Sequence, residues 1–462
     1  MRQAGNISKF WIMIPLMVGI SLSPLNVVFT SISLPTMRND FEVGIEQATW
    51  IGSAYFIPSV AFMPLQGYLG ERFGVRRVYA MGLFVLSIGA FLSALAPSFS
   101  WLLASRVVQG IGWSALYPLA MVMIRIHFTL ARQGEMMGFW ESAVGMTTII
   151  APPLGGVLVQ FLGWTSLYLV MGAVAVVGLL SSMAIPKTDL PGKLGSGRFD
   201  LSGALQFTLV LTLALIGIVR QSIFLLLCSG IVALLWFLLA RGKASAFVSP
   251  ALFTNRRFIS ASLAANLRKL VAIAALISLP IFFEDVQGLL PVAIGGLLIT
   301  YSLFLFIASW PGGRWADRAG AHVPGAVGFM LMIAGVLLLL GLDTSVNILL
   351  IVIALSVRGI GAGLAQAPYG KAAVDAAAPN QRQSAAAIYG TVRYSGLALG
   401  TALVGIFLDA RLNHYGAQSG GAAALAAYHE LWLLLAVLAS AGLLFTWLMA
   451  KSPDAPALAA ES

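Results

Sequence analysis

Charged side chains are rare in the long apolar runs of this 462-residue sequence, so each one found there is a candidate for function. Six lie well inside such runs: Arg106, Glu141, Arg268, Lys269, Arg358 and Arg393. A charge at the centre of a membrane-spanning helix costs about 2.5–3.5 kcal/mol on insertion scales, so it needs a reason. A desolvated glutamate can exchange a proton, and a buried cation can bind an anionic group. These residues therefore favour proton coupling and anion binding.

The elements that position these charges must lie in lipid. Hydrophobic residues make up 59% of the sequence and charged residues 10%, whereas soluble proteins are about 45–50% apolar and about 25% charged. We therefore predict an all-α polytopic membrane protein, because lipid offers no partners for free backbone groups. The net charge of +10 comes from cations in short connectors, which fits the positive-inside rule and not nucleic-acid binding. The single cysteine, Cys228, excludes a disulfide framework.

Apolar runs of about twenty residues predict fourteen transmembrane helices. They cover residues 10–34, 47–69, 78–96, 101–125, 136–160, 165–185, 201–219, 222–240, 258–283, 290–312, 323–341, 346–368, 385–408 and 428–450. With the N-terminus in the cytoplasm, only Arg38, Arg220 and Arg411 of the 27 lysines and arginines fall in outside connectors. The positive-inside rule therefore predicts that both termini are cytoplasmic.

Two charged, glycine-rich stretches indicate an internal repeat. "GYLGERFGVRR" at Gly67–Arg77 follows the second predicted span, and "GRWADRAG" at Gly313–Gly320 follows the tenth. The same topology at the same place in each half is typical of a parallel repeat. We therefore predict a six-helix bundle at 10–185, a linker with two inserted helices at 186–257, a second six-helix bundle at 258–450 and a cytoplasmic tail at 451–462.

Five stretches together resemble the major facilitator superfamily, in its fourteen-span drug:proton antiporter family, over essentially the whole chain. They are "GYLGERFGVRR", "RVVQGIG" at Arg106–Gly112, "APPLGG" at Ala151–Gly156, "RGIGAG" at Arg358–Gly363 and "VRYSGLALG" at Val392–Gly400. The resemblance implies alternating access, a location in the cytoplasmic (inner) membrane, and an antiporter motif that includes Pro152, Gly155 and Gly156. It also implies a conformational latch between the two halves, formed by Gly67, Glu71, Arg72, Gly74, Arg76, Arg77, Asp317 and Arg318. The alternative is that these basic loops only set topology.

A substrate cavity is the second implication. Arg106, Gly110, Trp113 and Tyr117 are spaced to share one helical face, which describes either a cavity wall or a seam between helices. The predicted substrate-binding residues are Asn26, Tyr55, Arg106, Trp113, Tyr117, Lys269, Arg358, Tyr389 and Arg393. Proton coupling is assigned to Glu141 with Arg106, and the alternative is that Glu141 only lies at the lipid headgroups.

The first span departs from the family pattern. Aligned on Leu34-Pro35, the position that is typically aspartate in the family holds Asn26, which cannot titrate. We therefore expect Arg106 to lack its usual counter-ion and to be available for an anionic group. Together with Arg268 and Lys269, this suggests an anionic or zwitterionic amphiphile as the substrate.

The sequence also limits the function by what it lacks. No G-x-x-x-x-G-K-[ST] loop occurs, so an ion or substrate gradient must supply the energy. The four histidines are scattered, and we expect no metal, no cofactor and no enzymatic activity. The sequence predicts a monomeric, proton-coupled exporter of amphiphilic drugs or toxic compounds, whose partners are a small molecule, protons and membrane lipids; whether it has an adaptor protein stays open. The alternative is an importer or exchanger of a specific anionic metabolite or lipid-like anion.

Overall fold

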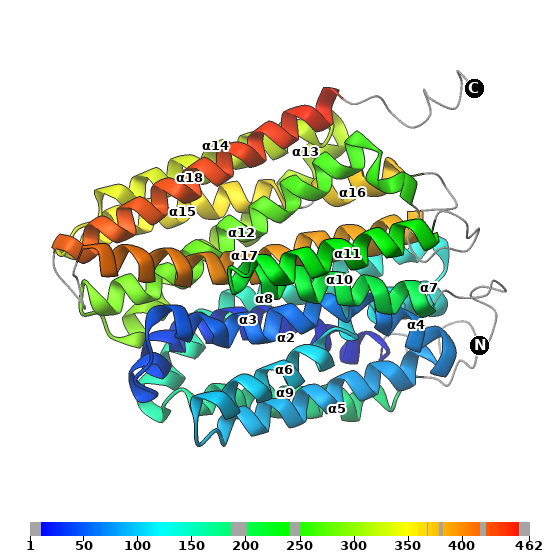
Figure 1. Cartoon of the computed structure of the whole chain (residues 1–462), viewed down its shortest axis with the longest axis horizontal. Coiled ribbons are helices and arrows are strands. Elements are labelled where there is room, and N and C mark those ends of the chain that lie inside the picture. The colour runs from blue at the N-terminus through cyan, green and yellow to red at the C-terminus, as the bar shows by residue number, and fades with distance from the viewer. Residues whose placement is uncertain are drawn as a thin grey trace. The chain divides into compact units, whose positions relative to one another are not determined.

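The computed structural model describes residues 11–185, 201–240, 250–366, 368–377, 382–415 and 422–451. Within these ranges every regular element is a helix and no strand occurs (Figure 1). The first eleven elements are α2 (Met13–Asp40), α3 (Ile45–Ala61), α4 (Met63–Phe73), α5 (Val75–Ala94), α6 (Phe99–Trp113), α7 (Leu116–His127), α8 (Leu130–Leu162), α9 (Thr165–Ser182), α10 (Leu201–Val219), α11 (Ile223–Ala240) and the short η1 (Pro250–Phe253). They are followed by α12 (Arg256–Asp285), α13 (Pro291–Ala319), α14 (His322–Leu338), η2 (Leu339–Gly341), α15 (Ile348–Leu364), α16 (Pro368–Asp375), α17 (Arg382–His414) and α18 (Ala422–Lys451).

Twelve helices in the described residues are long and apolar enough to span a membrane. Each coincides with one of the predicted spans. The two predicted spans without such a helix are 47–69, which is divided between α3 and α4, and 222–240, where the described apolar helix Ile223–Leu239 is shorter. The prediction of an all-α multi-pass membrane protein is confirmed, whereas the count of fourteen spans stays a prediction.

Several predicted spans are interrupted, and local chemistry explains where. The run 47–69 breaks at Phe62 because a proline occupies the first turn of α4, where its missing N–H does no harm. The run 101–125 breaks after Trp113, in a stretch that contains two glycines. The second interruption lies between Trp113, the last residue of α6, and Tyr117, in the first turn of α7, two residues predicted to bind substrate.

The chain divides into two compact units. Unit 1 contains residues 1–30, 54–151 and 161–247, and unit 2 contains 31–53, 152–160 and 248–462. The boundaries cross α2, α3 and α8, so one end of each of these helices packs with unit 2. In unit 1, α10 lies against α11 and α4. In unit 2, α12 lies against α17 and α18 (Figure 1). The division into bundles at 10–185 and 258–450 was predicted from repeated stretches in the sequence and not from contacts between helices. It stays a prediction.

The two units contain matching close approaches between helices. Gly74, between α4 and α5, has φ +95°, and Gly320, at the corresponding junction between α13 and α14, has φ +81°; only glycine adopts this conformation readily. A Cβ on Gly110 would overlap the backbone of Tyr55, and a Cβ on Gly359 in unit 2 would likewise overlap that of Tyr301. Small residues let helix backbones approach closely. In unit 1 the backbone of Tyr55 in α3 therefore packs against Gly110 in α6, and in unit 2 that of Tyr301 in α13 packs against Gly359 in α15.

Candidate functional site

Arg106 is the centre of a polar cluster inside unit 1. It lies on α6, is 0% exposed, and donates through Nη1 to Asn26 Oδ1 at 2.5 Å and to Gln109 Oε1 at 2.6 Å. Its Nη2 donates to Thr30 Oγ1 at 3.0 Å. Gln109 in turn donates to Ser93 Oγ at 2.6 Å, so the amide is held in place from both ends.

Aromatic rings cover the faces of this guanidinium. Its Cζ lies 4.7 Å from the ring centre of Tyr55 and 5.4 Å from that of Tyr168 on α9. The ring of Trp113 lies 6.4 Å from Tyr55, and Tyr117 on α7 lies 5.4 Å from Trp140. The structure therefore brings Asn26, Tyr55, Arg106 and Trp113 together, with Tyr117 held by a further tryptophan.

Arg106 has neutral partners in place of a counter-ion, and its predicted role in binding an anionic group stays a prediction. Three neutral side chains accept hydrogen bonds from it, and two tyrosine rings flank it. A missing carboxylate does not leave the guanidinium unsatisfied. The neutral oxygens of Asn26, Thr30 and Gln109 together accept its hydrogen bonds, because each offers lone pairs without a charge.

Unit 2 holds two further buried arginines in a different setting. Arg268 on α12 is 2% exposed and donates through Nη1 to the carbonyl of Ala362 on α15 at 3.3 Å. Arg358 on α15 is 1% exposed and donates through Nη2 to the carbonyl of Ala272 on α12 at 3.2 Å. Arg268 of α12 thus bonds to α15, and Arg358 of α15 bonds to α12. Each acceptor carbonyl lies one helical turn after the other arginine.

These two guanidiniums are poorly satisfied. Nε and Nη2 of Arg268, and Nε and Nη1 of Arg358, are buried without a hydrogen-bond acceptor. Among the described residues, the ionisable groups acting on Arg268 are Arg393 and the tyrosines 301, 369 and 389; no carboxylate is among them. Arg358 lies over the ring of Tyr301, 4.4 Å from its centre. Buried cations without an anion are costly, so this part of unit 2 is suited to receive a negative charge.

The other predicted residues of the second half surround this region. Arg393 and Tyr389 of α17 act electrostatically on Arg268. Lys269 lies 5.6 Å from the ring centre of Tyr394 and packs beside Gly396 of α17. Its neighbour on the same helical face, Asn266, donates to the carbonyl of Val392 at 2.6 Å. This polar face of α12 is therefore a packing surface against α17.

The residues assigned to the latch lie at two helix junctions. Gly67, Glu71 and Arg72 belong to α4, Gly74 caps it, and Arg76 and Arg77 open α5. Arg76 Nη2 donates to the carbonyl of Met183 at 2.8 Å. Asp317 and Arg318 lie in the last turn of α13, before Gly320. The side chains of Glu71, Asp317 and the predicted proton-coupling Glu141 fall outside the described residues, so the roles of all three stay predictions.

The proline and glycines of the antiporter motif lie in α8, in the segment that belongs to unit 2. Pro152 and Gly155 are buried. A Cβ on Gly156 would lie 2.5 Å from the carbonyl oxygen of Pro291, and one on Gly295 would overlap the carbonyl of Pro152. The motif thus lets this segment of α8 contact the start of α13 backbone to backbone.

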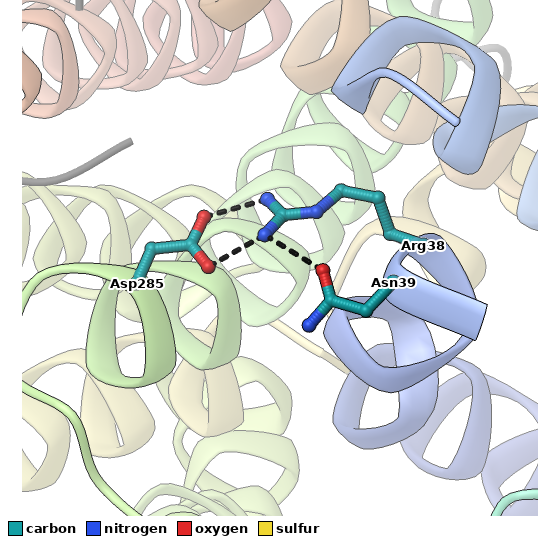
Figure 2. A network of polar contacts seen from close by, with 3 residues as sticks. All are labelled: Arg38, Asn39 and Asp285. Carbon is teal, nitrogen blue, oxygen red and sulfur yellow. Dashed lines mark hydrogen bonds and ion pairs between the residues drawn. The ribbon is translucent and has the colours of Figure 1, made fainter. Parts of the chain in front are cut away.

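One ion pair joins two segments of unit 2 that are far apart in sequence. Arg38, near the end of α2, donates to both carboxylate oxygens of Asp285, the last residue of α12, at 2.6 and 2.7 Å (Figure 2). Its Nη2 also reaches Asn39 Oδ1 at 3.4 Å. Parallel hydrogen bonds from one guanidinium to one carboxylate are a strong and directional contact. We call this Arg38–Asp285 contact the clasp.

Sequence reasoning missed several members of these clusters. Thr30, Gln109 and Tyr168 around Arg106, and Tyr301 beside Arg358, were not assigned to a site. The letters Gly-Ile-Gly follow both Gln109 and Arg358, so aligning on them would have matched these two positions. Aligning on the junction glycines Gly74 and Gly320 would have matched Tyr55 with Tyr301. For Thr30 and Tyr168 the sequence carries no comparable signal.

Comparisons with known proteins identify the family of the chain. The sequence model described as Major Facilitator Superfamily matches residues 16–401. Among relatives, the chain is 26% identical over 413 residues to "Riboflavin transporter RibZ" of Clostridioides difficile, covering 88% of this chain and 90% of that protein. It is 25% identical over 407 residues to "Multidrug resistance protein Stp" of Mycobacterium tuberculosis, covering 86% of this chain and 75% of that one.

Two solved structures share the fold. A bacterial homolog of the human lysosomal transporter Spinster superposes with a TM-score of 0.65 at 17% identity, covering 97% of this chain and 99% of that one. The nucleoside transporter NupG superposes with a TM-score of 0.68 at 13% identity, covering 96% of this chain and 100% of that one. At these identities the likeness concerns the fold alone.

Proposed function

The chain belongs to the Major Facilitator Superfamily and is a secondary transporter, not an enzyme, and from that premise we propose that it exports amphiphilic compounds from the cell in exchange for protons. Two observations support export of amphiphiles. Among the relatives, Stp is named a multidrug resistance protein and MdtP of Bacillus subtilis a multidrug transporter. The charged candidates also lie among aromatic rings, which suits a ligand that is partly apolar and partly charged.

The proposed substrate class rests on the environment of the Arg268 side chain. Its guanidinium is buried, two of its nitrogens have no acceptor, and Arg393 is the one charged group acting on it among the described residues. A buried cation beside a second cation is relieved by an incoming negative charge. The substrate we propose is therefore an amphiphile with an anionic group, which binds at Arg268 and Arg358, with Arg393 and Tyr389 contributing to the same region.

The mechanism we propose is alternating access in a monomer. Fourteen spans place both termini in the cytoplasm, and the bundles 10–185 and 258–450 pivot about the site in the cytoplasmic membrane. The helix junctions beside Glu71 and Asp317 latch the bundles in one state of the cycle. Glu141, which lies in a span and can titrate, carries the proton in place of the first-helix carboxylate that Asn26 replaces.

A second candidate is a carrier for one anionic metabolite, working as an importer or exchanger. The same unpaired arginines favour it, and the relative named as a riboflavin transporter shows that this branch of the family includes carriers named for a single metabolite. The two candidates differ in range: an exporter of amphiphiles accepts several anionic dyes, whereas a metabolite carrier rejects all but close analogues of its substrate.

Proteoliposomes with an imposed pH gradient test the substrate class. We expect outward transport of the anionic dye anilinonaphthalene sulfonate and little transport of the cation ethidium. Arg268→Gln should reduce transport of the anionic dye at least tenfold, while Arg220→Gln, which removes an exposed arginine between α10 and α11, should leave it unchanged. Preference for ethidium would contradict the anionic class.

The same vesicles test the proposed role of Glu141 in proton coupling. Glu141→Gln should abolish transport driven by the pH gradient while leaving exchange of internal for external dye intact, because exchange needs no net proton movement. Undiminished pH-driven transport by this variant would remove Glu141 from the mechanism.

A further inference from the structure

Two acids, Glu284 and Asp285, are adjacent at the end of α12, and among the described residues Arg38 is the cation that acts on Glu284. Asp285 uses both carboxylate oxygens on Arg38 (Figure 2). Glu284 precedes it on α12, and the charged groups that act on Glu284 among the described residues are Asp285 and Arg38. Its Oε2 is buried and has no hydrogen-bond partner. Arg38 therefore serves two carboxylates, and only one of them makes contact with it.

An ionised carboxylate is poorly placed at Glu284. A buried anionic oxygen without a donor loses its hydration and gains nothing in return, and a second carboxylate beside it is repulsive. Binding a proton removes the charge of Glu284 and leaves Arg38 and Asp285 as a matched pair. Glu284 is only half-buried, so its other oxygen is within reach of water and a proton can arrive there.

We propose that Glu284 is a proton-binding site that controls the clasp. With the proton bound, the cluster is electrically balanced and the Arg38–Asp285 contact stays closed. When the proton leaves, the carboxylate is stabilised by water rather than by protein, and the end of α2 separates from the end of α12 so that Glu284 becomes hydrated. The site takes only a proton, and the inference goes beyond the proposed function because it requires no particular substrate.

The other titratable groups at this end of unit 2 are paired, exposed to solvent or, like the buried hydroxyl of Tyr428, uncharged. On α18, Glu430 pairs with Arg411 at 2.7 Å, and Tyr428 lies near the clasp, where its ring packs 5.3 Å from Phe282. On α17, Asp409 accepts from Asn413 at 3.0 Å. On α2, Asn39 accepts from Arg38 and Asp40 is exposed. Glu284 therefore differs from the solvent-exposed acids of this end, because one of its oxygens is buried without a donor.

The test measures the clasp directly in the purified full-length protein, with no substrate present. In a Cys228→Ser background, spin labels are placed at Gln47→Cys, in the first turn of α3, and at Leu290→Cys, before α13; both positions are exposed and in unit 2. The distance between the labels is recorded by pulsed electron resonance at mildly acidic and mildly alkaline pH. We expect a longer distance at alkaline pH.

Three variants decide the outcome. Glu284→Gln, which mimics the protonated side chain, should keep the short distance at both pH values. Arg38→Gln should give the long distance at both, and Glu42→Gln, which neutralises an exposed acid of the same end, should keep the full pH response. The proposal is overturned if Glu284→Gln still responds to pH, or if the unaltered chain shows no response.

Infrared titration provides an independent readout of the proton itself. The carbonyl band of a protonated carboxyl that disappears between mildly acidic and mildly alkaline pH should be missing in Glu284→Gln and present in Glu42→Gln. A band that survives in Glu284→Gln would contradict the site. Because neither measurement involves transport, a failure of the proposed export function leaves both results unaffected.

Discussion

The buried arginines of the two units occupy the same kind of place but have opposite environments. Arg106 of unit 1 and Arg358 of unit 2 each lie on the fourth helix of their half, over a tyrosine ring, and are 0% and 1% exposed. Arg106 has three side-chain acceptors, whereas Arg358 has one backbone carbonyl and two nitrogens without an acceptor. Two equally buried arginines therefore differ in how many of their hydrogen-bond donors have an acceptor.

The helix contacts explain the difference. A Cβ on Gly89 of α5 would contact the backbone of Gln109, and one on Gly335, at the corresponding place in α14, would contact the backbone of Arg358. Arg358 thus occupies in unit 2 the place that Gln109 has in unit 1, so a donor replaces an acceptor. Its carbonyl partner Ala272 takes the position of Asn26 when the halves are aligned on their junction glycines, and a methyl group there cannot replace the amide. The hydrogen bonds of Arg106 favour a structural contribution, whereas the unmatched donors of the unit 2 arginines favour binding of a ligand, and the variants below test this contrast.

The largest effect is expected when the Arg106 cluster is broken. Arg106→Leu removes the common donor of Asn26, Thr30 and Gln109 and leaves buried acceptors unmatched, each at about 1–3 kcal/mol. We expect a marked loss of thermal stability in detergent, measured by the denaturation midpoint. Arg106→Lys should recover part of it, because one ammonium can still reach some of these oxygens. Unchanged stability of Arg106→Leu would erase the contrast between the units.

The matched glycines should respond alike. Gly110→Ala and Gly359→Ala each force a methyl group into the backbone of a neighbouring helix, and overpacking of this kind costs about 1–3 kcal/mol. We expect similar losses of stability in the same denaturation assay. Gly67→Ala is the control, because a Cβ there meets nothing within 4 Å. A large loss in only one of the pair would mean that the two contacts are not equivalent.

Replacing an arginine of unit 2 should affect ligand binding more than stability, which is the opposite of the effect expected for Arg106. Arg268→Gln removes a buried charge that has no carboxylate partner among the described residues, so stability should stay the same or rise, as often happens when a buried charge is replaced. Binding of anilinonaphthalene sulfonate, measured by fluorescence titration, should weaken at least tenfold. A variant that is less stable but binds the dye normally would assign Arg268 to structure.

The smallest change in structure is expected from Asn26→Asp. The new carboxylate keeps the position of Oδ1, so Arg106 retains its geometry while gaining an ionic partner. The stability should change little, but dye transport should acquire a new dependence on pH, because a group that can titrate now contacts Arg106. A pH profile identical to that of the unaltered chain would show that Arg106 is isolated from the transport cycle.

The sequence predicted the elements well because their signal is local. Long apolar runs and the glycine-rich stretches that contain Gly74 and Gly320 identify helices and junctions from neighbouring residues alone. The break within the predicted span 47–69, before the proline of α4, was not predicted. The sequence also identified the buried cations, since a charge within an apolar run is visible by inspection. It did not identify Tyr168 or Thr30, because they become partners of Arg106 only when α9 and α2 pack against α6.

By itself, then, the sequence determined a helical membrane protein, its internal repeat, its family resemblance and the rarity of its buried charges. The tertiary structure alone decided which of those charges are satisfied. Asn26 and Arg106 are 80 residues apart, and Arg38 and Asp285 are 247 apart. The free energy of a buried charge depends on the few atoms within hydrogen-bonding distance of it, and the chain's packing selects those atoms.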